Sequence, residues 1–571
     1  MALPPQANVF AYWNADPAAV EAVAGRVQAA GTYRHWRRVA GWVLAEDPLP
    51  GGAEPPGDAA PEVAIFEGAE TAAAGAGPAW RRDLGVAALT RPASLSRLAD
   101  TGFVAVSEDG RALAVRPGGG LAPLYVRCGG GSVTISTRLG DIPRLTVEAS
   151  SLDLLVHAVW YAGLPLFPDN RSFLTDVAVV PFGHHAVLGP DHPPRLARHW
   201  DPRPAVLAPS TAERLADHAT RLRELLLAYL ERHLAEGANL LTLSGGVDSS
   251  ALAILAAGVL GRGVSAFSLV PPSEPARLRE IGFLDLVEQR SHLVRCHRVD
   301  YTPEWALSHL GGMPDVGFPI LHPALRALPE IMAEEAVAVL FGGESADEMV
   351  GSLNFTMPDW ITHTRLPGLR HRSLPSGPRD VLRWWKWRLR SLAGAPRMAA
   401  SAELPPEVSA PVRDEYQEWW HRRRRALAGD RRPRAFTAAV LELDGWLAMN
   451  WEATTALGVR RAAPFAGREV IELALSCHPG ELIGPGTKRL LRAGLAEDLP
   501  GPILRRQDKG GWPSAAETTW ARELPGALGA AFRPGWPTAG AALRWTQAVA
   551  LTQLSQSAAA LGALPRSRAG S

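Results

Sequence analysis

Residues 239–257 read Asn-Leu-Leu-Thr-Leu-Ser-Gly-Gly-Val-Asp-Ser-Ser-Ala-Leu-Ala-Ile-Leu-Ala-Ala, and this stretch decides the fold of the chain. Apolar residues over 239–243 predict a buried strand, and the apolar run from residue 249 predicts a helix. Between them, Gly245 and Gly246 allow the backbone to approach a ligand closely. Unpaired N–H groups at a helix start favour anionic oxygens, so the stretch predicts a cradle for a pyrophosphate group. The hydroxyls in this cradle are those of Ser244, Ser249 and Ser250.

Asp248 is an acidic residue inside this anion cradle. Its charge repels phosphate, so its presence is best explained by a bridging Mg²⁺ ion, which prefers hard oxygen ligands. Residues 244–250 resemble the S-G-G-x-D-S-S signature of PP-loop ATP pyrophosphatases, and they lack the Gly-Lys-Ser/Thr of the Walker A pattern. The resemblance implies that ATP is cut between its α and β phosphates while a carboxylate is adenylated. The alternative is a Ser/Gly-rich turn without a ligand, which a match at all motif positions disfavours.

The composition of the chain excludes several classes of protein. A length of 571 residues predicts two domains and leaves room for a deep active site. The 59 basic and 58 acidic residues nearly balance, which argues against a protein that binds nucleic acid. Cys128, Cys296 and Cys477 lie far apart and predict neither a disulfide framework nor a zinc site with paired ligand spacing. No membrane span or signal peptide is recognisable, so we expect a cytoplasmic location.

The pattern of apolar residues changes near residue 205. Before it, short apolar runs such as 102–106 and 132–136 alternate with glycine-proline turns, which is typical of antiparallel sheets. After it, strands expected at 264–270 and 336–341 alternate with helices, which is typical of a parallel α/β sheet. We therefore predict one domain over residues 1–205 and a second over residues 206–571, joined by a proline-rich linker.

A second acidic loop follows the strand expected at 336–341. It reads Gly-Gly-Glu-Ser-Ala-Asp-Glu over residues 342–348, with two glycines and three carboxylates. Asp347 could join Asp248 in holding Mg²⁺ against the phosphates of ATP, because the ion usually takes one or two protein carboxylates. The alternative is an acidic helix start stabilised by the helix dipole. Together with the cradle, the loop favours the metal site.

Two lysines in the C-terminal third are candidates to contact phosphate. Lys509 lies in a glycine-containing loop, from which its charge can reach a phosphate or a developing oxyanion. Lys488 is expected on a helix, where a lysine more often lies on a solvated face. The pattern alone therefore favours solvent for Lys488 and the active site for Lys509.

Five motifs, in this order, resemble the synthetase domain of asparagine synthetase B-type enzymes. They begin at Leu243, Gly342, Pro464, Thr487 and Leu499, and they read LSGGVDSS, GGESADE, PFAGREVIELALS, TKRLLR and LPGPILRRQDKGG. The resemblance covers about residues 210–520. It implies a PP-loop α/β synthetase domain with helical additions, which uses ATP and Mg²⁺ to form an amide through an acyl-adenylate.

The resemblance also implies a role for most of the candidate residues. It makes Glu344 and Lys509 catalytic, with Lys509 stabilising the adenylation transition state, and it makes Asp248 and Asp347 ligands of Mg²⁺. Ser268 or Leu269 would line the adenosine together with Leu243 and Gly343. The full set of candidate ATP-binding residues is Leu243, Ser244, Gly245, Gly246, Asp248, Ser249, Ser250, Ser268, Gly343 and Lys488.

The N-terminal region resembles, more weakly, the glutaminase domain of the same enzymes. Residues 102–106 and 116–125 carry this resemblance, which implies an Ntn-hydrolase-like antiparallel β-sandwich. Glutamine-using members have a cysteine directly after the initiator methionine, and covalent amide hydrolysis needs this nucleophile. The sequence here begins Met1-Ala2-Leu3. We therefore expect an inactive N-terminal domain and an amine that does not come from glutamine.

Relatives without this cysteine include lasso peptide cyclases and β-lactam synthetases. Resemblance to the cyclases implies that an Asp or Glu side chain of a ribosomal precursor peptide is adenylated and that the peptide's own N-terminal amine then closes a macrolactam. The implied partners are a leader peptidase and a leader-recognition protein. β-Lactam synthetases carry a tyrosine at the position of Glu344, which weakens that alternative. An ammonia-dependent amide synthetase and a noncatalytic paralogue are two further candidates.

Tryptophan and arginine are concentrated between residues 383 and 425. Such a region offers aromatic and cationic surface to a peptide substrate. The alternative is a set of ordinary helices whose tryptophans, such as Trp419, pack inward while the arginines are solvated, and the pattern favours this second interpretation.

Overall fold

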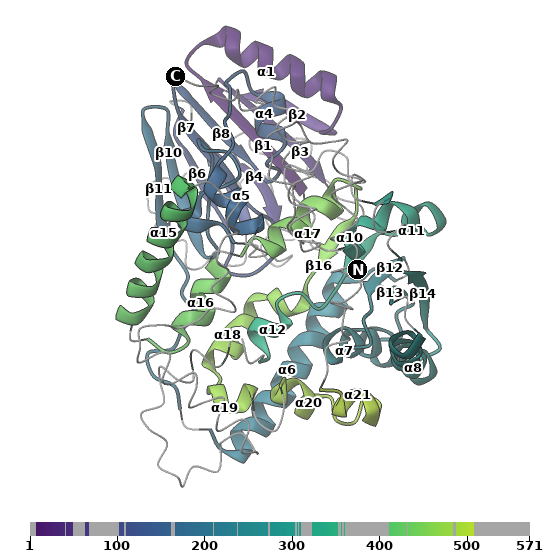
Figure 1. Cartoon of the computed structure of the whole chain (residues 1–571). Coiled ribbons are helices and arrows are strands. Elements are labelled where there is room, and N and C mark those ends of the chain that lie inside the picture. Colours follow the sequence, from purple (N-terminus) through teal and green to yellow (C-terminus); the bar gives the residue numbers. More distant parts are fainter. Residues whose placement is uncertain are drawn as a thin grey trace.

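The computed structural model describes residues 7–48, 63–67, 102–302, 323–351 and 410–507, apart from short gaps within these ranges, and a few isolated residues between 305 and 359. Lys509 and the tryptophan-rich stretch 383–388 lie outside the described residues. Figure 1 shows two antiparallel sheets at one end of the molecule and a parallel sheet at the other.

The first antiparallel sheet has six strands in the order β2-β3-β1-β8-β7-β9. These are β1 (Ala7–Asn14), β2 (His35–Val39), β3 (Trp42–Pro48), β7 (Tyr125–Gly129), β8 (Ser132–Ser136) and β9 (Ala178–Val179). The β7–β8 hairpin turns through Gly130 and Gly131, whose φ angles of 61° and 78° suit a two-residue hairpin loop. Glycine adopts both of these angles without strain.

The second antiparallel sheet has five strands in the order β11-β10-β6-β5-β4. These are β4 (Val63–Glu67), β5 (Gly102–Val106), β6 (Ala112–Val115), β10 (His184–Gly189) and β11 (His192–Arg198). The two antiparallel sheets share one core, to which Val9 and Ile135 contribute from the first and Val104 and Leu188 from the second. Helix α1 (Pro17–Ala30) packs through Val23 on another core cluster of the first sheet.

Antiparallel sheets in this part of the chain agree with the expectation from the sequence, whereas the likeness to an Ntn-hydrolase glutaminase domain stays a prediction. The division into two domains at residue 205 also stays a prediction. The antiparallel sheets end at Arg198 and the parallel sheet begins at Asn239, so the sheets fall on either side of the expected boundary.

The parallel sheet has the strand order β14-β13-β12-β15-β16. Its strands are β12 (Asn239–Thr242), β13 (Val264–Val270), β14 (Val294–Asp300), β15 (Val339–Phe341) and β16 (Arg460–Ala462), and all neighbouring pairs are parallel. The strand expected at 336–341 is therefore shorter than expected. It begins at Val339 because the backbone N–H groups of Ala338 and Val339 both donate to the carbonyl of Ala238, which has a φ of 59°.

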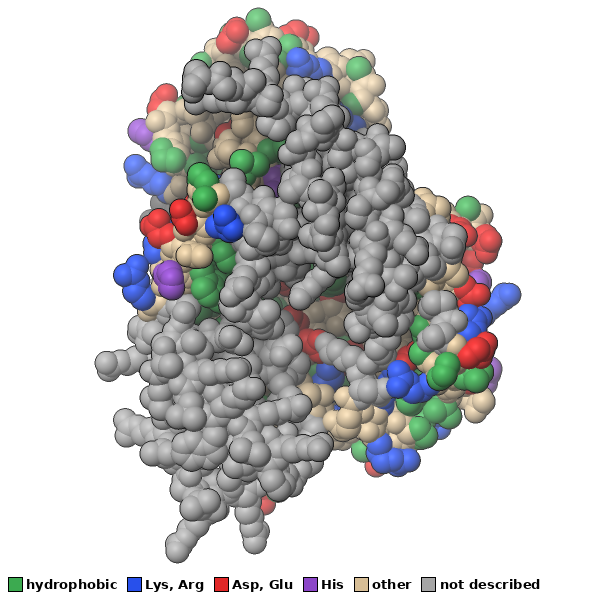
Figure 2. Space-filling view, in the orientation of Figure 1, with side chains coloured by type: hydrophobic (Ala, Val, Ile, Leu, Met, Phe, Trp, Pro, Cys, Tyr) green, Lys and Arg blue, Asp and Glu red, His purple; other side chains and the backbone are tan. Residues whose placement is uncertain are grey.

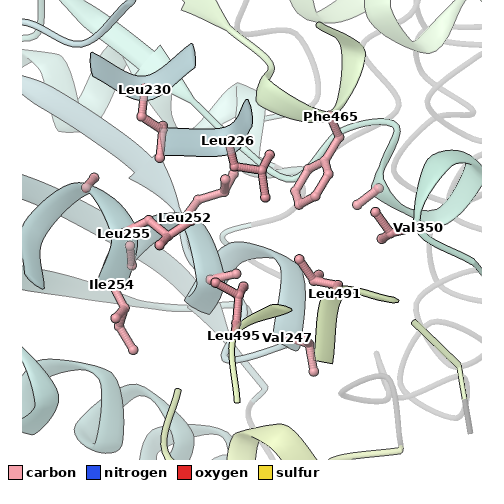
Figure 3. Close-up of a cluster of buried hydrophobic side chains, with 14 of the residues drawn as sticks. Leu226, Leu230, Val247, Leu252, Ile254, Leu255, Val350, Phe465, Leu491 and Leu495 are labelled. Carbon is pink, nitrogen blue, oxygen red and sulfur yellow. The ribbon is translucent and has the colours of Figure 1, made fainter. Parts of the chain in front are cut away.

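Helices and core side chains surround this sheet. Helix α6 (Ala212–His233) begins at Ala212 because the Thr211 hydroxyl accepts a hydrogen bond of 3.2 Å from the Arg214 N–H. Figure 3 shows Leu226 and Leu230 of α6 in the same buried cluster as Leu252 of α7 (Val247–Ile254). Complete burial of one such leucine contributes about 1.5–3 kcal/mol, so this cluster fixes the helix that follows the cradle.

The remaining helices of the α/β part connect or cover these layers. They are α8 (Glu274–Arg290), α10 (Pro323–Arg326), α11 (Leu328–Glu334), α12 (Ala346–Met349), α18 (Arg468–Ser476), α19 (Pro479–Leu482), α20 (Arg489–Gly494) and α21 (Gly501–Arg505), with the single turns η3 (Leu255–Val259) and η4 (Pro464–Ala466). The helices that lie between the sheets or beside the antiparallel sheets are α4 (Asp141–Leu145), α5 (Leu154–Tyr161), η2 (Pro168–Asn170), α15 (Ala410–Gly429), α16 (Ala435–Glu442) and α17 (Trp446–Thr455).

A buried carboxyl group joins the antiparallel and parallel parts of the molecule. Glu452 of α17 is 1% exposed, and its Oε1 accepts a hydrogen bond of 2.7 Å from the backbone N–H of Leu139. A shared apolar cluster includes Tyr125 and Trp160 from the first part and Phe267 from β13. Burial raises the pKa of Glu452 to about 8.

The tryptophans of α15 face the interior. Trp419 is 1% exposed and packs with Val159 of α5 and Val440 of α16. Arg422 of the same helix lies at the surface and pairs with Asp169 at 2.6 Å. The inward-packing interpretation is therefore confirmed for Trp419, and its ring is not available as a peptide-binding surface.

The surface of the described residues carries mixed charges. On the face in Figure 2, basic and acidic side chains are interspersed over the described part without a broad area of one sign. Among the described helices, none combines the length and the apolar composition needed to cross a membrane.

Candidate active site

The candidate active site lies where the order of the parallel strands reverses. Strands β12, β13 and β14 follow one another in one direction, and the chain then returns to place β15 on the other side of β12. Ligands of open parallel sheets bind outside the carboxyl ends of the strands at such a reversal. The loop that contains Ser244 follows β12, which ends at Thr242, and the loop after β15 begins at Gly342, so both predicted loops lie at this point.

The first loop is a tight turn that only glycine permits. Gly245 has a φ of 63°, and a Cβ atom there would lie 2.8 Å from the Cβ of Phe283. Hydroxyl groups brace the turn, because the N–H of Ser244 donates to Ser249 Oγ at 3.1 Å. Helix α7 starts directly afterwards, at Val247, and no side chain in the described part of the chain caps it. Its first N–H groups therefore face the loop, as an anion cradle requires.

The second loop contacts the first. A Cβ atom on Gly343 would lie 3.1 Å from the Cβ of Asp248, so a larger residue at 343 would push the loops apart. Ser345 then adopts a φ of 63° and leads into α12, whose first turn carries Asp347. The two acidic side chains predicted to share a metal ion thus come from adjacent loops of neighbouring strands.

Lys488 lies between these two carboxylates. Its ammonium group forms an ion pair with Asp248 and lies 3.0 Å from Asp347 Oδ1. Burial opposes the charge of this lysine, but the charges of Asp248 and Asp347 outweigh it and raise the pKa of Lys488. Only 10% of the side chain is exposed. The solvated position that the sequence favoured for Lys488 is therefore wrong, because the residue precedes α20 with a φ of 60° and turns into the site.

The pair of carboxylates fits a metal ion. Asp248 and Asp347 already converge on one positive charge, that of Lys488, and both offer the hard oxygen ligands that Mg²⁺ prefers. These two residues would hold the ion. When bound, Mg²⁺ supplies charge neutralisation for the phosphates of ATP.

Glu344 is fixed by a buried arginine. Its Oε1 pairs with Arg461 of β16, whose side chain is fully buried, and burial lowers the pKa of that guanidinium although Glu344 opposes the shift. Oε2 of Glu344 is also buried, and it has no hydrogen-bond partner among the described residues. One oxygen therefore sets the orientation of the carboxylate, and the other has no hydrogen-bond partner in the part of the chain that the structure describes.

The candidate adenosine-binding residues lie on neighbouring strands. The N–H of Leu243 continues the ladder of β12 by donating to the carbonyl of Phe267 at 2.9 Å, and Ser268 follows on β13. Leu243 and Ser268 are 2% and 6% exposed. Gly343 follows β15 on the other side of β12. Ser249 and Ser250 are buried in the first turn of α7.

Arginine residues that the sequence analysis did not single out support the cradle. Arg506 donates to the carbonyl of Gly245 at 3.0 Å, pairs with both carboxylate oxygens of Glu280 at 2.7 and 2.8 Å, and lies over the ring of Phe283. Arg492 donates to the carbonyl of Thr487 at 2.9 Å. Arg506 lies three residues before Lys509, and the basic run containing both residues was the signal in the sequence.

Comparison with known proteins agrees with this geometry. The asparagine synthase family model matches residues 221–560, which is more than half of the 571-residue chain and contains both loops and Lys488. No curated protein matches the chain. The chain therefore belongs to the asparagine synthase family, whose members are ATP-dependent carbon–nitrogen ligases that form AMP and pyrophosphate.

Proposed function

We propose that this ligase closes a macrolactam in a ribosomal precursor peptide of the lasso type. In the first half-reaction, an Asp or Glu side chain of the peptide attacks the α phosphate of ATP, and pyrophosphate leaves. In the second, the N-terminal amine of the same peptide attacks the acyl carbon, AMP leaves, and the amine loses a proton. Amide formation driven by ATP is the activity of the family, and closure of a peptide ring is the new part of the proposal.

The adenylation half-reaction is supported by the two loops at the strand reversal. The turn at Ser244-Gly245-Gly246 and the uncapped start of α7 suit the pyrophosphate that leaves. Lys488, between Asp248 and Asp347, supplies a positive charge next to this cradle. Such charges stabilise a transition state best when water is largely excluded, and Lys488 is only 10% exposed.

The cysteines of the chain bear on the source of the amine. Burial raises the pKa of the Cys128 thiol to about 11 and that of the Cys296 thiol to about 12, and it also raises the pKa of Cys477. A thiol must ionise to act as a nucleophile. None of these three residues is therefore a candidate to release ammonia from glutamine, which leaves an amine of the substrate itself or free ammonia as the attacking group.

Ring closure within one peptide has a physical advantage over capture of a free amine. When both ends of the substrate are bound, the second half-reaction becomes intramolecular, and such proximity can lower a barrier by several kcal/mol. Oε2 of Glu344 has no hydrogen-bond partner among the described residues and is a candidate to accept the proton of the attacking amine. A leader peptidase and a leader-recognition protein would prepare and deliver the peptide.

ATP–pyrophosphate exchange tests the proposal directly. The purified chain is assayed with linear peptides that carry one internal acidic side chain and a free N-terminus, and separately with aspartate plus ammonium. Peptide-dependent exchange, together with a product that has lost one water, would support ring closure. Exchange with aspartate alone would replace the proposal by small-molecule amide synthesis.

Two variants make the exchange assay specific. Asp347→Asn should abolish exchange, since it removes one carboxylate from the pair around Lys488. Glu224→Gln changes an exposed acid on α6 and should leave exchange unchanged. Absence of exchange with every substrate, in the presence of the two partner proteins, would support a noncatalytic paralogue.

A further inference from the structure

A second cluster of ionisable side chains lies outside the ATP site. His218 of α6, Cys477 after α18 and Glu481 of α19 bring one ligand atom each within 4.8 Å of the others. His218 Nδ1 lies 2.7 Å from Glu481 Oε2 and 3.4 Å from Cys477 Sγ. The cysteine and the histidine are 259 residues apart in the sequence, so cysteine spacing alone could not predict this cluster.

We propose that His218, Cys477 and Glu481 form a zinc-binding site that joins α6 to α19. The proposal goes beyond amide formation and is independent of the peptide substrate. A thiolate, an imidazole and a carboxylate are the ligand types that Zn²⁺ takes, whereas Mg²⁺ takes oxygen ligands only. Zinc bond lengths place tetrahedral ligands about 3.3–3.7 Å apart. The Sγ–Nδ1 distance of 3.4 Å lies in this range, whereas Nδ1 and Oε2, at the 2.7 Å of a hydrogen bond, must move apart by about 0.6 Å when the ion binds.

The arrangement does not fit a nucleophilic triad. In a triad the histidine uses one ring nitrogen for the nucleophile and the other for the carboxylate. Here Cys477 and Glu481 both contact Nδ1 of His218, so the three groups converge on one point. Cys477 and Glu481 are also fully buried, so a substrate could not reach the thiol.

The surroundings of the proposed site allow a second oxygen of Glu481 and a water molecule to take part in zinc binding. Oε1 of Glu481 is buried and accepts no hydrogen bond from the part of the chain that the structure describes, and Arg214 Nε lies 3.8 Å from it. The side chain of Arg214 is 37% exposed and can move into solvent when a cation binds. His218 is 17% exposed, which gives a water molecule access as a fourth ligand.

Charge balance is also favourable. Binding replaces the S–H bond of Cys477 by an S–Zn bond and releases that proton, and the imidazole of His218 binds through a nitrogen that carries no proton. The thiolate and the Glu481 carboxylate then balance the two charges of the ion. Arg434 lies near Cys477, but its guanidinium is paired with Asp359 at 3.1 Å.

The proposed site is connected to Lys488 through short contacts. The carbonyl of Gly480, on α19, accepts a hydrogen bond of 2.9 Å from Arg489. Gly351 packs against Leu482, the last residue of α19, and its carbonyl accepts the N–H of Lys488 at 2.8 Å. A metal ion on α19 would therefore hold the segment that positions Lys488.

Metal titration tests this site. Metal-free, full-length protein is titrated with Zn²⁺ in excess Mg²⁺, so that Mg²⁺ competes for sites made only of oxygen ligands, and one Zn²⁺ per chain is expected to bind. Co²⁺ in the same site should give the absorption of a tetrahedral ion and a thiolate charge-transfer band. His218→Gln changes a partly exposed side chain and should weaken Zn²⁺ binding by at least about 100-fold. Loss of a residue that only hydrogen-bonds to a metal ligand already lowers metal affinity by about 10–100-fold.

Matched cysteine variants make the test decisive. Cys477→Ser should remove the charge-transfer band, whereas Cys296→Ser, at a thiol that is only partly buried and lies outside the cluster, should leave it unchanged. Circular dichroism of each metal-free variant establishes that it is folded. Absence of saturable Zn²⁺ binding by the wild type would overturn the proposal. Equal Zn²⁺ affinity in the wild type, His218→Gln and Cys477→Ser would also overturn it, because the ion would then bind elsewhere.

Discussion

Replacement of Lys488 by methionine should destabilise the protein, and Mg²⁺ should reverse the effect. The ammonium group neutralises Asp248 and Asp347 together, so Lys488→Met leaves two carboxylates facing each other. Removal of one partner from a fully buried ion pair costs about 3–5 kcal/mol. The two carboxylate side chains are 20% and 25% exposed, so water screens part of the repulsion and we expect a loss of about 2 kcal/mol.

Urea unfolding with and without Mg²⁺ measures this effect. Without Mg²⁺, the free energy of unfolding of Lys488→Met should fall by about 2 kcal/mol. Added Mg²⁺ should stabilise the variant more than the wild type, since the ion no longer competes with an ammonium group. Arg232→Met is the control, because Arg232 forms an exposed pair with Glu469 and such pairs contribute about 0–1 kcal/mol. Equal stability of Lys488→Met and wild type without Mg²⁺ would refute the reasoning.

Three further changes have defined outcomes. Gly245→Ala should abolish ATP binding in calorimetry, because alanine disfavours the φ of 63° and its Cβ would lie 2.8 Å from the Cβ of Phe283. Gly261→Ala is the control: its φ of 66° is equally unfavourable, but the space around its Cβ is open, so this variant should bind ATP normally. Arg506→Lys should raise the KM for ATP in the exchange assay, because one ammonium group cannot replace the two guanidinium nitrogens that separately contact Gly245 and Glu280. Glu452 has a pKa raised to about 8, so its neutral form stabilises the fold fully below about pH 4.5, and this contribution is lost as the pH rises to 8. Urea unfolding should show wild-type stability falling by about 2 kcal/mol from about pH 6 to 8 and a smaller fall in Glu452→Gln.

The cradle and the acidic loop could be predicted because their signals are local. A strand, two glycines and a helix start follow one another within the loop at residue 244, and the same holds for the loop at residue 342. Carboxyl ends of neighbouring parallel strands meet at one edge of the sheet, so the approach of Asp248 and Asp347 follows from the strand order. The strand order itself was not evident from the sequence.

Contacts between distant segments could not be predicted in the same way. Lys488 pairs with a residue 240 positions earlier, and it enters the site only because a residue other than glycine adopts a φ of 60°. Arg461 is charged, yet it lies fully buried in a strand, because Glu344 supplies its counter-charge. Both cases oppose the usual preference of basic residues for solvent, and only the complete fold provides the compensating carboxylates.

The position of Lys488 also explains how the site keeps two acidic side chains together before ATP arrives. Its backbone is fixed by the hydrogen bond of 2.8 Å to Gly351, whereas its side chain has four rotatable bonds. If Mg²⁺ takes the place of the ammonium group between Asp248 and Asp347, rotation of this one side chain would make room for the ion without movement of the loops. Since those loops are in contact at Gly343, the cradle keeps its shape while its charge is rearranged, and binding of ATP then involves little reorganisation of the backbone.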